Sequence, residues 1–107
     1  MGKPLPPVDH RISLPDAAKK TKKYKAKKEH KKPFPVGAFH RSAFETILAQ
    51  PGCVGIRAYP AEQDDGAATM ILVGVDVDGN DMVDGELAQD LITCPFICSD
   101  GNALNQG

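Results

Sequence analysis

Residues 53–84, CVGIRAYPAEQDDGAATMILVGVDVDGNDMVD, decide the fold, because only here does a hydrophobic pattern run long enough between turn signals to build a core. The stretch is typical of strand, turn, strand, turn and strand, with turns at residues 65–66 and 78–80. Its middle run, Ala68–Val75, is apolar on both faces, as expected for a strand with neighbours on both edges. We therefore predict an antiparallel meander with this run as its central strand.

The outer strands of the meander are expected at residues 53–59 and 81–83. In the first of them Val54, Ile56 and Ala58 share one face and Cys53, Arg57 and Tyr59 the other, and we expect one side to pack on the helix. Asp84-Gly85 is a further turn signal, and the chain after it is rich in Gly, Asn, Pro and Ser, which favours a loop-like end.

A short helix is expected just before the meander. The sequence SAFE at residues 42–45 matches the capping box, in which a serine hydroxyl and a glutamate carboxylate bind free backbone N–H groups at a helix start. The helix should run from Ala43 to about Gln50 and end at Pro51-Gly52. Its apolar face, at positions i, i+3 and i+4, is formed by Phe44, Ile47 and Leu48.

Charge divides the chain at Ser42. Residues 1–41 hold twelve of the thirteen basic residues and three acids, a net charge of +9, whereas the remainder holds Arg57 and eleven acids, a net charge of −10. The two parts are therefore candidates to bind each other, within one molecule or between neighbours. Salt should weaken such a contact.

The basic part is expected to be an extended or helical arm. Residues 1–9 are proline-rich with little to bury, which predicts an extended, poorly ordered leader. From Ser13 an N-cap pattern favours a helix, but nine lysines within residues 19–32 repel one another, so we expect the arm to order on a partner. The segment PFPVGAFH at residues 33–40 should be extended and could form an edge strand, where proline is tolerated.

These elements predict an α+β fold, with one short helix packed on a small antiparallel meander. We divide the chain into a proline- and lysine-rich arm at residues 1–33, a core domain at 34–93 and a Cys-Pro/Gly/Asn-rich tail at 94–107. The 107 residues suffice for one domain at most. With no signal peptide or membrane span in the sequence, a cytoplasmic location is the default expectation.

The acidic run from Asp76 to Glu86 resembles an EF-hand calcium loop, with oxygen ligands at positions 1, 3, 5 and 9 (Asp76, Asp78, Asn80 and Asp84). Position 6 is Asp81 where the sharp turn needs glycine, and position 12 is Leu87 where a bidentate glutamate belongs. We therefore favour a hairpin turn rich in Asp and Asn over a small metal-binding regulatory domain, which stays an alternative.

Three cysteines, Cys53, Cys94 and Cys98, are an odd number in a chain without an export signal. With one histidine they could form a Cys3His zinc site, and Cys94 with Cys98 could form a disulfide. Partly buried thiols are favoured over both. We find no nucleophile with a base, no glycine loop for phosphate and no H-x-x-x-H pair, so the chain is not expected to be an enzyme or to hold a cofactor.

Three parts of the sequence also resemble a group of short, uncharacterised bacterial proteins, mostly of the Bacteroidota. They are AQPGCVGIRAY at residues 49–59, GVDVDGNDM at 74–82 and CPFICSDGNALN at 94–105. The resemblance covers roughly residues 38–105 and implies kinship but no activity, cofactor or partner. The lysine-rich arm lies outside it.

The charge division favours a non-enzymatic structural protein that self-associates, with the basic arm of one copy docked on the acidic domain of a neighbour in a homo-oligomer or filament. The alternative is a nucleic-acid or polyanion binder that uses the same arm, with Tyr24 stacking on bases, and a solvated tail is the plainest interpretation. The candidate interaction residues are Lys19, Lys20, Lys22, Lys23, Tyr24, Lys25, Lys27, Lys28, Lys31, Lys32, Asp76, Asp78, Asp81, Asp84 and Glu86.

Overall fold

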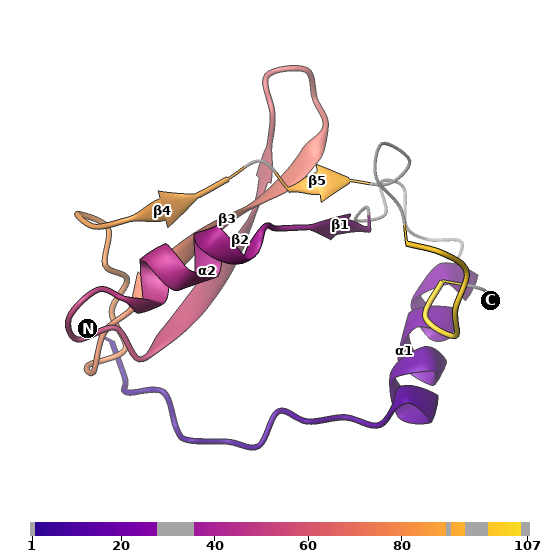
Figure 1. Cartoon of the computed structure of the whole chain (residues 1–107), viewed down its shortest axis with the longest axis horizontal. Coiled ribbons are helices and arrows are strands. Elements are labelled where there is room, and N and C mark those ends of the chain that lie inside the picture. The colour runs from indigo at the N-terminus through magenta and orange to yellow at the C-terminus, as the bar shows by residue number, and fades with distance from the viewer. Residues whose placement is uncertain (1, 28–35, 90, 94–98, 106–107) are drawn as a thin grey trace.

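The computed structural model describes residues 2–27, 36–89, 91–93 and 99–105, and within them the chain has an α+β fold. The elements in order are α1 (Leu14–Ala26), β1 (Gly37–Ala38), α2 (Arg41–Leu48), β2 (Gly55–Glu62), β3 (Ala68–Val75), β4 (Leu87–Ala88) and β5 (Ile92–Thr93). Figure 1 shows α2 lying along the sheet and α1 standing apart from it. The three-stranded sheet has the order β2-β3-β4 and is antiparallel throughout.

Strand β3 is the centre of the sheet, which confirms the prediction for residues 68–75. It pairs with β2 over eight residues, from Gly55 opposite Val75 to Glu62 opposite Ala68. Its other edge pairs with β4 only at Leu72 and Val73. The predicted turns are also confirmed, because Gly66 and Gly79 adopt the positive φ angles of 88° and 83° that glycine tolerates best.

The third strand begins later than predicted. Residues 81–83 form no strand: Asp81 makes a single bridge to Val75, and the chain then turns, with the Gly85 N–H donating to the Met82 carbonyl over 3.1 Å. The Gln50 Oε1 atom accepts a hydrogen bond from the Glu86 N–H at 2.8 Å, which guides the chain back toward the sheet. Pairing therefore resumes only at β4.

Helix α2 also begins earlier than the capping box predicted. His40 is the N-cap, and its Nδ1 atom accepts from the Ser42 N–H at 3.1 Å. Glu45 forms an i,i+4 ion pair with Arg41 instead of reaching back to a free N–H. The imidazole supplies the acceptor that Ser42 was expected to supply, so the first turn starts two residues sooner.

The core is small and lies where α2 meets the sheet. Its buried apolar side chains, among the described residues, are Ile47, Leu72, Val73 and Val75. The prediction for the apolar face of α2 is right for Ile47 but wrong for its neighbours: Leu48 is 51% exposed, and Phe44 is over one third exposed. Phe44 instead packs edge-on against Phe39, with ring centroids 6.1 Å apart.

Strand β2 is less covered than predicted. Helix α2 contacts this strand, as expected, but of the three apolar residues on one face only Ile56 is half-buried, whereas Val54 and Ala58 are exposed. An eight-residue helix is only about 12 Å long, whereas an eight-residue strand spans about 26 Å. Helix α2 therefore cannot cover the whole strand.

The two ends of the core domain pair with each other. Strand β1 runs antiparallel to β5, with Gly37 opposite Thr93 and Ala38 opposite Ile92. This confirms an edge strand at residues 37–38 of the predicted segment, while its two prolines lie outside the described residues. The tail is turn-rich over residues 99–105, as expected, and the leader is extended up to α1.

Replacing Ile47 with alanine tests where the core lies. Because this side chain is 1% exposed, Ile47→Ala should lower the free energy of unfolding by about 2–5 kcal/mol. Leu48→Ala is the matched control, since it removes a similar volume from the exposed face of the same helix and should change that free energy by about 0.5 kcal/mol or less. Urea unfolding followed by circular dichroism gives both values. Equal losses would contradict this placement.

Candidate functional site

Helix α1 carries the lysine-rich part of the arm and buries none of its residues. Ser13 caps it, with the hydroxyl oxygen accepting from the Asp16 N–H at 3.2 Å, and Pro15 lies in the first turn. Asp16 in the first turn and Lys23 and Lys25 in the last turn complement the helix dipole. The helix is therefore held by its ends rather than by burial, and none of the other helices and strands that the structure describes contacts it.

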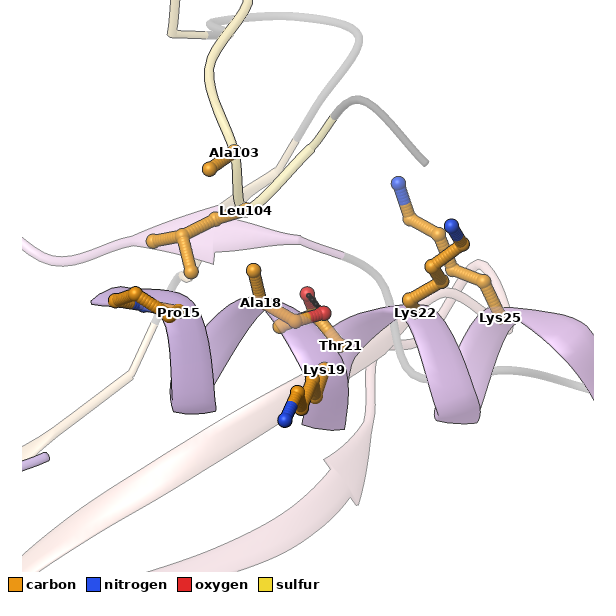
Figure 2. Close-up of a pocket in the computed structure, with 8 residues that line it drawn as sticks. All are labelled: Pro15, Ala18, Lys19, Thr21, Lys22, Lys25, Ala103 and Leu104. Carbon is orange, nitrogen blue, oxygen red and sulfur yellow. Dashed lines mark hydrogen bonds between the residues drawn. The ribbon is translucent and has the colours of Figure 1, made fainter. Parts of the chain in front are cut away.

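The C-terminal tail covers one side of α1. Figure 2 shows Leu104 directed toward Pro15 and Ala18, with the side chain of Lys19 pointing away from the tail. The tail and the helix border a hollow of about 260 Å³. The Lys25 ammonium donates to the Asn105 carbonyl over 2.9 Å, which fixes the tail along the helix.

The other side of α1 is open and basic. Lys20, Lys23, Tyr24 and Lys27 line a shallow hollow there, and we call these four residues the basic face. Tyr24 is 39% exposed. In the part of the chain that the structure describes, none of these three lysines, and neither Lys19 nor Lys22, forms an ion pair. Lys28, Lys31 and Lys32 lie outside the described residues.

The acidic residues of the candidate set lie on the loops that join β3 to β4. Asp78, Asp84 and Glu86 are exposed and Asp76 is half-buried, and we call these four residues the acidic region. The Asp76 carboxylate accepts from the N–H groups of Asp78 at 2.9 Å and Asn80 at 3.0 Å. It therefore holds the hairpin turn, as expected for an aspartate that opens such a turn.

The positions of the described side chains test part of the calcium and zinc alternatives. Among the described residues, no three His, Cys, Asp or Glu side chains lie close enough together to hold a metal ion. The Cys53 thiol is half-buried and donates to the Gly55 carbonyl at 3.2 Å. Cys94 and Cys98 lie outside the described residues, so the structure does not test the predictions for that pair.

Asp81 belongs to a separate internal cluster. One carboxylate oxygen lies 2.5 Å from the Arg57 guanidinium, and the other accepts a hydrogen bond from the Tyr59 hydroxyl. Its side chain is only 19% exposed. Both oxygens are thus used within the molecule, so Asp81 is a weaker candidate for binding a partner than its acidic neighbours.

The contacts of this cluster shift its pKa values. The hydrogen bond from Tyr59, and to a smaller extent that from Arg57, lowers the pKa of the Asp81 carboxyl below its ordinary value. The hydrogen bond between Tyr59 and Asp81 also raises the pKa of the Tyr59 hydroxyl. Arg57 and Tyr59 were not among the predicted site residues. Arg57 and Tyr59 lie two residues apart on the same face of β2. Nothing in the sequence of that strand indicates that Asp81, which follows Tyr59 by 22 residues, will lie against them.

The basic face and the acidic region lie at opposite ends of the molecule. Figure 1 is drawn with the longest axis, 40 Å, horizontal: α1 stands at one end, and the loops between β3 and β4 lie at the other. The screening length in physiological salt is only about 8 Å. The two charged surfaces of one copy therefore do not neutralise each other, and both remain open to another molecule.

Comparison of the chain with protein-family models, with curated proteins and with solved structures found no match to any of them. The resemblance to short bacterial proteins therefore stays a prediction. None of the described helices has the length and apolar character needed to cross a membrane.

The Asp81 cluster should make stability depend on acid pH. A carboxyl whose pKa is lowered by folding stabilises the fold above its unfolded pKa, and this stabilisation disappears as pH falls through the folded pKa. The wild type should therefore lose more stability than Asp81→Asn as pH falls from about 5 to about 2. Urea midpoints measured across this range test it.

The control for this experiment is Asp84→Asn, which removes an exposed carboxylate that forms no hydrogen bond or ion pair with the described residues. Its acid profile should follow that of the wild type. If the profiles of Asp81→Asn and the wild type overlap, the cluster contributes nothing to stability in this range.

Proposed function

We propose that this protein is a non-enzymatic structural protein that self-associates head to tail. The basic face of α1 in one copy docks on the acidic region of the next copy. The observation that supports this arrangement is the placement of the two surfaces at opposite ends of the 40 Å axis, where one copy cannot bring them together. The partner is a second copy of the chain.

The two surfaces match in charge and in exposure. The basic face presents three lysines without ion pairs in the described part of the chain, and the acidic region presents three exposed carboxylates. Opposite potentials of this kind direct encounter and fix register more than they supply raw affinity. Because each copy carries both surfaces, the contact is heterologous, and it generates a ring or an open filament.

Helix α1 is suited to this task because it is presented rather than buried. Among the described helices and strands none packs on it, and its basic face borders a shallow, open hollow. The core of the domain does not depend on it, so docking requires little rearrangement of the sheet. Exposed ion pairs are weak one by one, so several must act together at such an interface.

A nucleic-acid or polyanion binder is the second candidate function. The observation that favours it is Tyr24, which lies among Lys20, Lys23 and Lys27 and is partly exposed. An aromatic ring between cations suits a single strand, whose bases stack while its phosphates pair with ammonium groups. This candidate uses only the basic face and gives the acidic region no role.

Charge reversal tests the head-to-tail contact. In light scattering of nuclease-treated protein, the wild type should form large particles at low salt that shrink at high salt. A triple variant with Lys20, Lys23 and Lys27 changed to Glu should stay monomeric. A second triple variant, with Asp78, Asp84 and Glu86 changed to Lys, should also stay monomeric, because its basic face meets a basic region.

Mixing the two variants is the decisive control. Each then offers the other a complementary pair of surfaces, so an equal mixture should assemble although neither variant does so alone. Circular dichroism checks that the helix survives in the first variant. A wild type that is monomeric at every salt concentration would overturn the proposal, and loss of nucleic-acid binding in the first variant alone would then favour the polyanion binder.

A further inference from the structure

The start of the leader lies in a shaped seat at the acidic end of the core domain. A Cβ atom added at Gly79 would collide with the Lys3 carbonyl oxygen, and one added at Gly2 would collide with the Asn80 side chain. Farther along, a Leu5 methyl carbon lies 2.8 Å from the position that a Cβ on Gly55 would occupy. We call the surface formed by Gly55, Gly79 and Asn80 the leader seat.

The seat depends on glycine. Gly79 is buried and adopts a positive φ, so this position both makes the hairpin turn and allows the leader backbone to pass close over it. At Gly55 the missing side chain leaves room for Leu5 on the edge strand β2. At both positions the absence of a side chain is what allows the leader to lie this close to the core.

The leader is nevertheless held by few interactions. Among the described residues, no hydrogen bond or ion pair joins residues 2–8 to the core domain. Leu5 and Val8 stay about half exposed, and a hollow of about 620 Å³ separates parts of the leader from Val54 and Ile56. Release therefore breaks van der Waals contacts but no ladder of backbone bonds.

The segment that joins the leader to α1 is held by one local interaction. The Asp9 carboxylate accepts from the backbone N–H of Arg11 at 3.0 Å and from its guanidinium at 2.7 Å. Both side chains are exposed, at 62% and 91%, and neither forms a hydrogen bond or ion pair with the part of the sheet that the structure describes. A segment held only by an interaction between its own residues can reorient without breaking contacts of the core.

We propose that the leader seat of one copy receives the leader of a second copy, so that neighbouring copies exchange their N-terminal segments. The proposed ligand of the seat has a known sequence, because it is the same leader that occupies the seat within its own chain. Exchange of an identical element replaces each contact by the same contact between copies, which makes it a low-cost route to association. This interface uses no lysine of α1, and it therefore goes beyond the head-to-tail contact.

Exchange can be measured with the intact chain. Equal amounts of ¹⁴N- and ¹⁵N-labelled protein are mixed and treated with a zero-length carbodiimide, which joins the Lys3 amine to carboxylates of the turn at Asp78. Cross-linked peptides of mixed isotope composition can come only from two different copies. At about 1 mM protein, which equals the effective concentration of a short tether, about a quarter of the leader-to-turn cross-links should be mixed.

Two variants connect these cross-links to the seat. Leu5→Ser leaves the core untouched and should reduce the total yield of leader-to-turn cross-links several-fold, because the contact at Gly55 is lost. Gly79→Ala should reduce it further, and urea unfolding verifies that this variant folds. A yield that neither variant changes would show random collisions and overturn the proposal.

The same measurement separates leader exchange from docking of α1. Mixed cross-links should persist at high salt and in the variant with Lys20, Lys23 and Lys27 changed to Glu, where head-to-tail docking fails. If every leader-to-turn cross-link comes from one isotope, the leader stays on its own chain and exchange is excluded. If no such cross-link forms at all, the seat itself is unoccupied in solution and the inference also fails.

Discussion

The small size of the core is the constraint on which the rest of this structure depends. Four apolar side chains are buried among the described residues, and they come from one short helix and the central strand. This core covers only part of the three-stranded sheet, and helix α1 adds no buried residue to it. The helix is held instead by its cap and its terminal charges, together with the tail.

The features that could be predicted from sequence are those decided by neighbouring residues. The apolar run of β3 and the glycine turns at Gly66 and Gly79 depend on period and local turn chemistry, and both are found as predicted. The N-cap at Ser13 is equally local. The division of the chain into a basic and an acidic part is also evident from the sequence. The sequence does not show that the two charged surfaces lie at opposite ends of the molecule.

The features that could not be predicted depend on contacts distant in sequence or on a choice between similar acceptors. The start of β4 follows a hydrogen bond between Gln50 and Glu86, which are 36 residues apart, so no local pattern indicates it. At α2 two acceptors compete within one turn, and the imidazole of His40 takes the place expected for Ser42. The cluster of Arg57, Tyr59 and Asp81 again joins a strand to a later turn.

The leader seat could not be predicted from the sequence either. The hairpin turn already explains Gly79, so this glycine gives no sign of a contact with a distant segment. The position of the seat links the two proposed contacts, because the seat lies on the same turn that carries Asp76 and Asp78. A neighbour that docks α1 on this end must approach beside the leader. A leader that leaves for a neighbour requires the two copies to approach each other, and the basic face can direct that approach toward the acidic region. Charge would thus favour exchange within a head-to-tail series over exchange within an isolated pair, and the two contacts would reinforce the same open arrangement.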